Sequence, residues 1–400
     1  MKTHLKTISA AGLSWLIFSA SFAATKNNAS DFEDASSFDI AAVENSVHLL
    51  FGKEDPKEKN SLRFFYTKSE DGGESWEKPV EIPTDHAPPG RHQRGHDPQI
   101  ALAGDQLMAL WTARGEGPFG SGGIATALSS DGGKTWKKGP SPDGKSDSAG
   151  FRFPAAAGGE KAFHAVWIHA EEEERSLRYS KLSLGTGDWS PIEIVDDHIC
   201  ACCWNQIRIA EDGTIAVIYR DQEPSDMSLA ISENNGRWKR VGSVGTFNWD
   251  FLGCPHVGSG FALNPTEAFG DSRLLATAWT GESETRGAYI LTSDDRGKSW
   301  QSRLIPETDS PGNINTDLVR FSSKEAVLVW DRAGEKNSRQ IFISKTEDNA
   351  ESWSAPKRIS EKNSKATHPR IAATTDGYLL LWTESTEGGK SALRIVKENR

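Results

Sequence analysis

The sequence predicts an all-β fold, a β-propeller with seven blades, and three observations carry that prediction. A turn motif of the form Ser/Thr-x-Asp-x-Gly-x-x-Trp occurs three times, and a fourth copy has Ala350 in place of the Gly. Short alternating runs that end in an aromatic residue recur every 52–59 residues, which is enough chain for four strands with their turns. Turn-forming and aromatic residues are frequent, with 37 Gly, 18 Pro and 14 Trp. A stack of β-sandwiches is the alternative, and the regular period disfavours it.

The turn motif marks one hairpin in each blade that carries it. Its Asp side chain accepts hydrogen bonds from backbone N–H groups of the same hairpin, and its Gly supplies a positive φ. The Trp lies on the next strand and covers the turn. The four copies run over residues 69–76, 129–136, 293–300 and 346–353, and weaker copies end at Trp189 and Trp238. Each copy is predicted to join the third and fourth strands of its blade.

The blade count follows from repeated starts of the strand pattern. These starts lie near residues 38, 97, 152, 204, 258, 314 and 368. Seven blades fit best, and six remain if one start is an insertion. The seventh blade lacks a fourth strand before Arg400, so we expect the ring to close by pairing N- and C-terminal strands, with residues 31–37 as the missing strand.

The N-terminal residues indicate export. Basic residues precede an apolar run over residues 8–22, and Ser21-Phe22-Ala23 has the small residues of a cleavage site. We therefore predict a signal peptide over residues 1–23 with cleavage after Ala23, a polar lead-in over 24–37 and a propeller domain over 38–400. The expected location is periplasmic or secreted. A run of about 15 apolar residues is too short for a membrane span, and a net charge of −10 argues against nucleic-acid binding.

The four turns resemble the Asp boxes of the sialidase superfamily and of related secreted BNR-repeat propellers, including exo-α-sialidases. The resemblance covers essentially the whole mature chain and implies a propeller fold. Because such boxes occur on propellers with unrelated activities, function has to be argued from the site. In this architecture the loops that lead into each first strand lie on the face opposite the Asp boxes, together with the loops between second and third strands. We expect the functional residues on that face.

One candidate site on that face binds a carboxylate through arginines. The sialidase resemblance implies three arginines that clamp a sugar carboxylate, an acidic acid/base and a tyrosine–glutamate nucleophile pair. The segment Phe151-Arg152-Phe153-Pro154 is similar to the family's Phe-Arg-Ile-Pro element, but it follows the second box, whereas the family element precedes the first. The candidate substrate-binding residues are Arg152, Arg220, Arg332 and Arg370, and the candidate catalytic residues are Asp97, Tyr219 and Glu384. Alternatively, the arginines are ordinary ion-pair partners.

The second candidate is a cysteine and histidine cluster. Two segments at adjacent blade starts carry it, Cys200-Ala-Cys202-Cys203 and Cys254-Pro-His256, with His198 nearby. Thiolates and imidazoles suit copper(I) or zinc, whereas four cysteines in an exported chain favour a disulfide from Cys254 to one of the other three. A redox-active pair is a third possibility.

These two candidate sites leave three functions open. The first is a glycan-recognising protein, which as an enzyme would be a hydrolase of the exo-α-sialidase type. The second is a periplasmic metal-binding or redox-linked protein. The third is a binding scaffold braced by disulfides. The expected ligand is a glycan or another small molecule, and copper or zinc is the metal to consider.

Overall fold

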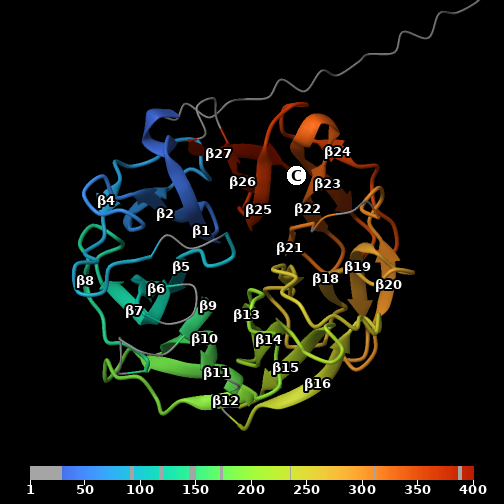
Figure 1. Cartoon of the computed structure of the whole chain (residues 1–400), viewed down its shortest axis with the longest axis horizontal. Helices are drawn as coiled ribbons and strands as arrows, with labels where there is room; N and C mark the ends of the chain where they lie inside the picture. The colour runs from blue at the N-terminus through green and yellow to red at the C-terminus, as the bar shows by residue number, and fades with distance from the viewer. Residues whose placement is uncertain are drawn as a thin grey trace, which may run out of the picture.

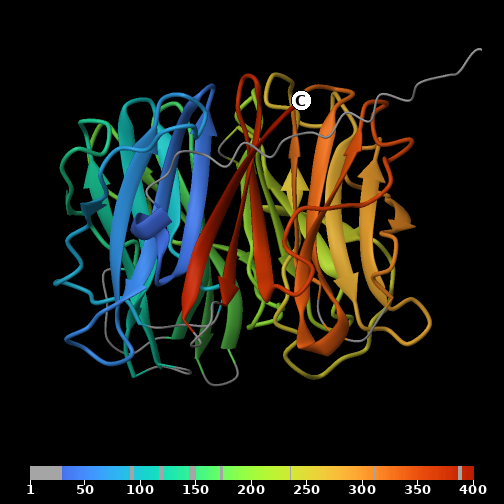
Figure 2. The same cartoon turned by 90° about the horizontal axis from the view of Figure 1, so that it is seen from above.

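The computed structural model of the chain describes residues 29–90, 94–116, 120–143, 150–171, 174–234, 236–309, 312, 314–385 and 390–400. The predicted signal peptide lies outside these residues. Seven antiparallel sheets surround a central axis as the blades of a propeller (Figure 1). Seen from the side, the strands run along the axis between two faces made of loops (Figure 2). The seven-bladed all-β fold predicted from the sequence is confirmed.

Each blade begins with the strand closest to the axis and adds the next strands outward. Blade 1 comprises β1 (Ala35–Val43), β2 (Ser46–Glu54), β3 (Leu62–Ser69) and β4 (Val80–Glu81), and blade 2 comprises β5 (Gln99–Ala103), β6 (Gln106–Arg114), β7 (Ser121–Ser129) and β8 (Lys137–Lys138). Blade 3 comprises β9 (Gly150–Gly158), β10 (Ala162–Glu171), β11 (Glu174–Ser183) and β12 (Glu193–Asp196). Blade 4 comprises β13 (Gln206–Ile209), β14 (Ile215–Arg220), β15 (Met227–Ser232) and β16 (Lys239–Val244).

The remaining blades follow the same plan. Blade 5 comprises β17 (Phe261–Ala262), β18 (Leu274–Thr280), β19 (Gly287–Ser293) and β20 (Gln301–Leu304). Blade 6 comprises β21 (Thr316–Arg320), β22 (Ala326–Ala333), β23 (Arg339–Thr346) and β24 (Lys357–Arg358). Blade 7 comprises β25 (Ala366–Ala373), β26 (Gly377–Ser385) and β27 (Ser391–Asn399). Two short 3₁₀ helices complete the described elements, η1 (Ala29–Phe32) and η3 (Glu335–Asn337).

The ring closes where the sequence predicts, between the N-terminal lead-in and the last strand, but through one bridge instead of a full strand. Blade 7 has three strands, and in the described chain the outer edge of β27 meets the lead-in at one bridge, Glu33 to Ala392. The expected fourth strand does not form because β1 takes the residues from Ala35 onward for blade 1, before the domain start predicted at residue 38. Instead, η1 places the Phe32 ring 5.6 Å from that of Phe51. Apolar packing and one bridge therefore replace a strand at the seam.

The Asp boxes have the predicted chemistry. The Asp131 carboxylate accepts hydrogen bonds from the Thr135 N–H at 2.9 Å and the Thr135 hydroxyl at 2.6 Å. Gly133 has φ +91°, and a Cβ there would lie 2.0 Å from the Tyr66 ring, so both backbone and space require glycine. These bonds, the one from Thr135 Oγ1 foremost, lower the pKa of Asp131 to about 2.

The box of blade 1 identifies the face on which these turns lie. The Gly72 N–H donates to the Asn45 carbonyl, which belongs to the hairpin between β1 and β2. In blade 6 the Asn349 N–H likewise donates to the Lys324 carbonyl between β21 and β22. The Asp boxes therefore share one face with the hairpins of the two inner strands. The loops that lead into each inner strand lie on the other face, called here the site face.

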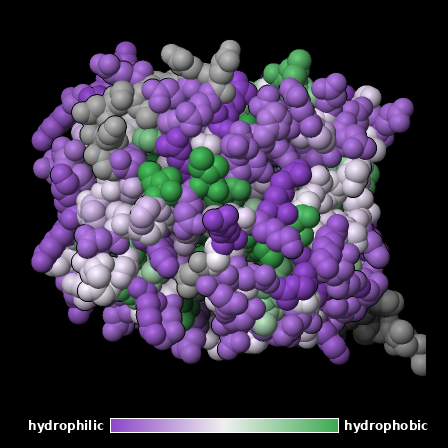
Figure 3. Space-filling view, turned by 90° about the horizontal axis from the view of Figure 1, so that it is seen from below, coloured by the Kyte–Doolittle hydropathy of each residue, from purple (hydrophilic) through white to green (hydrophobic). Residues whose placement is uncertain are grey.

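The core lies between neighbouring blades, where apolar side chains from facing sheets interdigitate. Trp111, Trp167 and Trp330 are almost fully buried there, on the second strands of blades 2, 3 and 6. The rim in Figure 3 is mostly hydrophilic with small separate apolar patches. Among the described residues, no helix is long and apolar enough to cross a membrane.

Candidate functional site

The inner strands surround a central channel of about 430 Å³, and one predicted ligand-binding arginine lies in it. The Arg370 guanidinium lies 3.7 Å from the Asp39 carboxylate and 3.9 Å from that of Asp317. Both carboxylates also link blades, since they accept the backbone N–H groups of Ile100 and Ile371. Arg370 thus balances two buried acids rather than offering its charge to a ligand.

On the site face, aromatic and histidine rings crowd the axis. The Trp204 ring has the His256 ring at 5.9 Å and the His368 ring at 5.6 Å. Asp97 lies beside them, where its carboxylate accepts the Arg94 Nε–H at 2.8 Å and the Gly95 N–H at 3.0 Å. The cavity that Asp97 borders holds about 20 Å³, roughly the space of one water molecule. Asp97, the predicted acid/base, is therefore buried among the side chains packed near the axis, and the cavity that it borders is too small for a sugar.

Arg220 also has a structural position. Its guanidinium is buried and donates to three backbone carbonyls, of Ser225 at 2.6 Å, Trp279 at 3.0 Å and Val257 at 3.3 Å. It also lies 5.5 Å from the centre of the Trp249 ring. The prediction of a ligand-binding Arg220 is not supported, because the neighbouring loops use its hydrogen-bonding capacity.

Arg332 and Glu384 lie in blades 6 and 7 and engage local partners. Arg332 pairs with Glu307 and lies 4.1 Å from the centre of the Phe342 ring. Glu384 accepts the Trp382 Nε1–H at 3.1 Å. Neither side chain reaches the position of Arg152 in blade 3, so the four predicted arginines do not converge on one carboxylate.

Tyr219 does not form the predicted nucleophile pair with Glu384. Its side chain is buried in β14 of blade 4, and its hydroxyl donates to the Asp196 carboxylate. Burial, reinforced by that hydrogen bond, raises the pKa of Tyr219. Blades 4 and 7 also lie on opposite sides of the axis (Figure 1). A tyrosinate in this position is unfavourable and has no glutamate beside it.

One predicted arginine does face a cavity. Arg152 from β9 contributes to a pocket of about 330 Å³ on the site face. We call it the arginine–cysteine pocket, and its described lining residues are Arg152, Ala170, Arg175, Cys200, Ala201, Cys202, Gln222, Ser225, Phe251, Leu252, Gly253 and Cys254. Strands and loops of blades 3 and 4, together with the loop that leads to blade 5, supply these residues.

The pocket concentrates positive charge. Arg152 is buried while Arg175 is exposed at the start of β11, and the Arg175 Nη1–H donates to Gln222 Oε1 at 3.1 Å. Burial, followed by repulsion from Arg175, lowers the pKa of Arg152. Two guanidiniums at one cavity are stabilised by an anion between them, and a carboxylate matches their planar donor geometry.

The far wall of the pocket is the loop between β16 and β17, and polar contacts fasten it to blade 4. The Asp226 carboxylate accepts three successive N–H groups of this loop, from residues 247 to 249. The Ser225 hydroxyl donates to the Phe251 carbonyl at 3.0 Å. The Phe251 ring stacks on Trp249, 4.9 Å between centres, and keeps 39% of its surface exposed. A held, exposed aromatic ring thus borders the pocket.

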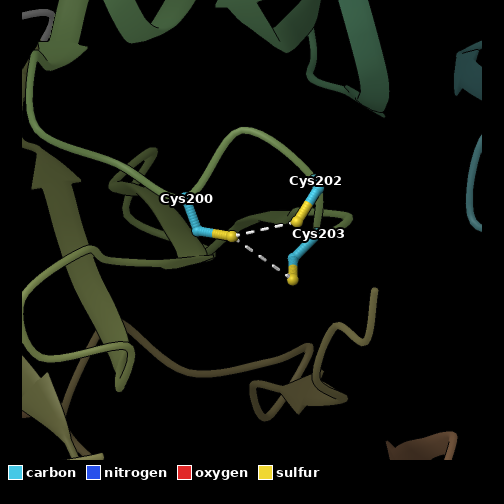
Figure 4. A group of neighbouring side chains, drawn as sticks. All are labelled: Cys200, Cys202 and Cys203. Atoms are coloured by element: carbon cyan, nitrogen blue, oxygen red, sulfur yellow. Dashed lines mark hydrogen bonds between the residues drawn. The ribbon is translucent and has the colours of Figure 1, made fainter. Parts of the chain in front are cut away.

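The cysteines form the floor of this pocket. Cys202 and Cys254 form a disulfide that links the loop before β13 to the loop before β17. Cys200 and Cys203 remain as thiols, and the Cys200 sulfur lies 3.3 Å from Cys202 Sγ and 3.7 Å from Cys203 Sγ (Figure 4). The predicted disulfide from Cys254 to the clustered cysteines is therefore formed, and Cys202 is its partner.

The positions of these sulfur atoms show whether the predicted metal site can form. Among the described residues, Cys200, Cys202 and Cys203 form a group with ligand atoms within 4.8 Å of one another, and neither predicted histidine belongs to it. His198 is exposed, and the His256 Nε2 lies 2.8 Å from the Arg94 carbonyl oxygen. With Cys202 in a disulfide, two thiols remain. That is fewer than the three or four protein ligands of a zinc site, so the residues do not fit zinc in this state.

Sequence reasoning missed most of the pocket. Arg175, Gln222 and Ser225 lie in or next to loops between second and third strands, which the face argument already assigned to the site face. Phe251 and Leu252 had no such signal, because Phe247, Trp249 and Val257 make the same loop apolar along its length, and only the structure shows that Leu252 is 85% exposed. Arg91 and Asn313, polar residues that precede the inner strands of blades 2 and 6 in the sequence, lie outside the described residues.

Comparison with known proteins supports the fold. The pattern of BNR repeat-like domains matches residues 161–399, more than half of the chain. No curated protein matches the sequence. A solved ulvan lyase, described as a new family of polysaccharide lyase, has a TM-score of 0.62 at 10% identity and covers 92% of this chain and 96% of its own.

Two further solved structures extend this comparison. The β-propeller domain of the Trilobed protease from Pyrococcus furiosus has a TM-score of 0.51 at 10% identity, covering 92% of this chain and 97% of its own. An intramolecular trans-sialidase from Ruminococcus gnavus has a TM-score of 0.48 at 11% identity, covering 93% and 95%. Lyase and protease domains share this architecture, so the likeness shows the fold alone.

Proposed function

The chain belongs to the family of BNR repeat-like domains, and from that premise we propose that it is an exported glycan-binding protein that recognises a carboxylate-bearing sugar. The binding site is the arginine–cysteine pocket on the face opposite the Asp boxes. The observation that carries the proposal is the pairing of Arg152 and Arg175 at one cavity of about 330 Å³. That volume is at the small end of the range for ligand pockets, which suits one or two sugar rings.

Each part of the pocket has a role in such binding. The two guanidiniums neutralise the sugar carboxylate, and charge-assisted hydrogen bonds of this kind are among the stronger ones in proteins. Gln222 and Ser225 offer an amide and a hydroxyl at the same cavity. The exposed face of Phe251 provides an apolar platform for the C–H groups of a sugar ring.

The proposal concerns recognition rather than hydrolysis. Glycoside hydrolysis needs two side chains on opposite sides of the scissile bond, no more than about 10 Å apart. None of Asp97, Tyr219 and Glu384 lines the arginine–cysteine pocket, and Tyr219 is buried. A fluorogenic sialoside should therefore bind without being cleaved.

Calorimetric titration tests the proposal with sialyllactose and digalacturonate as acidic probes and lactose as the neutral control. We expect the acidic sugars to bind and lactose to bind at least tenfold more weakly. Arg175→Gln should weaken the acidic sugars by about 10- to 100-fold, the equivalent of one hydrogen bond to a charged group.

A matched variant controls for general charge effects. Arg178 lies three residues further along β11 and pairs with Glu174 at 3.0 Å, away from the pocket lining. Arg178→Gln changes the same net charge, so it should bind the acidic sugars as wild type does. Equal affinity for lactose and the acidic probes, or equal losses in both variants, would overturn the proposal.

A further inference from the structure

The thiols of Cys200 and Cys203 form a pair whose spacing in the chain has a known chemistry. They are the first and last residues of Cys200-Ala-Cys202-Cys203, which is a Cys-x-x-Cys segment. Their sulfurs lie 3.7 Å apart (Figure 4), and both are free thiols outside the Cys202–Cys254 disulfide. A small rotation of the two side chains brings these sulfurs to the bonding distance of about 2.05 Å.

The two thiols differ in their access to solvent. Cys200 is only 6% exposed, but it lines the arginine–cysteine pocket, so a molecule that enters the pocket comes into contact with this residue. Cys203 is completely buried and lies outside the described pocket lining. A first cysteine that lines a pocket and a second one that lies behind it are the arrangement in which one thiol attacks and the other resolves.

The electrostatics agree with that division. The hydrogen bond between the two thiols, then the Cys202 N–H and the charges of Arg220 and Arg175, lowers the pKa of Cys200 to about 7. Burial raises the pKa of Cys203. Near neutral pH a substantial fraction of Cys200 is therefore thiolate, whereas Cys203 keeps its proton.

We propose that Cys200 and Cys203 are a redox-active dithiol that reduces a small, carboxylate-bearing disulfide entering the arginine–cysteine pocket. Arg152 and Arg175 attract the carboxylates of the incoming molecule. This recognition uses the arginines of the proposed glycan site, but the thiol chemistry is independent of whether a sugar binds.

The reaction balances in two steps. The Cys200 thiolate attacks one sulfur of the incoming disulfide, forms a mixed disulfide and expels the other half as a thiolate. The Cys203 thiol then attacks the Cys200 sulfur and passes its proton to the departing sulfur, so the second half leaves as a thiol. The small disulfide gains two electrons and becomes two thiols, while the protein gains a Cys200–Cys203 disulfide.

The Cys202–Cys254 disulfide has a separate, structural role. It joins loops 52 residues apart in the chain and holds the wall of the pocket that carries Phe251. Cys200 Sγ lies 3.3 Å from Cys202 Sγ, so attack within the protein is the competing reaction. Its products would be a Cys200–Cys202 bond and a released Cys254 thiol, which peptide mapping distinguishes.

The test uses the native mature protein and the dianionic disulfide 5,5′-dithiobis(2-nitrobenzoate), with neutral 4,4′-dithiodipyridine as a second probe. Wild type should release two thionitrobenzoates per chain, keep no adduct and yield a Cys200–Cys203 cross-link in peptide mass spectra. Cys203→Ser should release one and retain the other half on Cys200. Cys200→Ser should release none until it is unfolded.

Charge recognition has its own readout. Arg175→Gln should slow the reaction with the dianionic probe at least tenfold and leave the rate with the neutral probe within twofold. Arg178→Gln is the matched control and should slow neither. Equal slowing of both probes in Arg175→Gln would refute the recognition step.

Three results on wild type alone would overturn the dithiol, whether or not the variants fold. One is a persistent mixed disulfide at Cys200, and another is a Cys200–Cys202 cross-link with a free Cys254. The third is stoichiometric copper or zinc that blocks both thiols until a chelator removes it. Failure of sugar binding with an intact Cys200–Cys203 cross-link would refute the glycan proposal only.

Discussion

Replacing Arg220 by alanine separates a structural arginine from a ligand-binding one. The substitution removes three hydrogen bonds from a charged donor to the carbonyls of Ser225, Val257 and Trp279. Each bond to a charged group contributes about 1.5–3 kcal/mol, and the relieved cost of burying the guanidinium offsets part of the total. We expect a loss of about 3 kcal/mol in the free energy of unfolding.

The assay is thermal unfolding followed by tryptophan fluorescence, with Arg332→Ala as the control. For a chain of this length, about 3 kcal/mol lowers the melting temperature by about 4 °C. Arg332 pairs with a largely exposed Glu307, an interaction that contributes about 1 kcal/mol or less. Arg220→Lys keeps the charge without the planar fork and should fall between wild type and Arg220→Ala. An Arg220→Ala protein that melts within about 1 °C of wild type would refute the structural role.

Three further predictions concern stability. Reduction of the Cys202–Cys254 disulfide, whose cysteines are 52 residues apart, should lower the free energy of unfolding measured in urea by about 4 kcal/mol, as loop-closure entropy predicts. The stability of a Cys202→Ser/Cys254→Ser double variant should not change when reductant is added. The pKa of Asp131 is lowered to about 2, so the stabilisation that its charge contributes is present above about pH 4 and is lost as the pH falls towards 2. The urea midpoints of wild type and Asp131→Asn should therefore differ at about pH 4 and above and become equal as the pH approaches about 2. Burial lowers the pKa of His164 to about 4, so wild type should lose stability as the pH falls from about 6.5 to 4, and the pH profile of His164→Asn should be flatter over that interval.

The sequence was sufficient for the architecture because the blade signals are local. An Asp box is contained within eight residues, and alternation within a strand reports which side is buried. All seven predicted starts therefore lie within a few residues of the inner strands. The junction between blades 7 and 1 was harder to predict. The same N-terminal residues can extend β1 in blade 1 or pair with β27 in blade 7, and no local pattern decides between the two.

The site was less predictable because it depends on contacts between distant segments. Arg152 and Arg220 are both buried arginines near strand ends, yet one lines a cavity and the other bonds to carbonyls. Which of the two occurs is decided by the loop between β16 and β17, which has no periodic pattern. The cysteines were easier to predict, because residues at adjacent blade starts must be neighbours in a propeller.

The long last strand has a consequence for self-association. The outer strands of the other blades are two to six residues long, whereas β27 has nine residues and one described bridge along its outer side. An edge of this length is a template on which another chain can add a strand. Arg394 and Lys397 place positive charges on this strand, and the Lys397 ammonium pairs with the Glu74 carboxylate of blade 1 at 2.8 Å. Charges on an edge strand oppose pairing with another chain, so we expect a neutral substitution at Lys397 to make the protein aggregate more readily through the edge of its last strand.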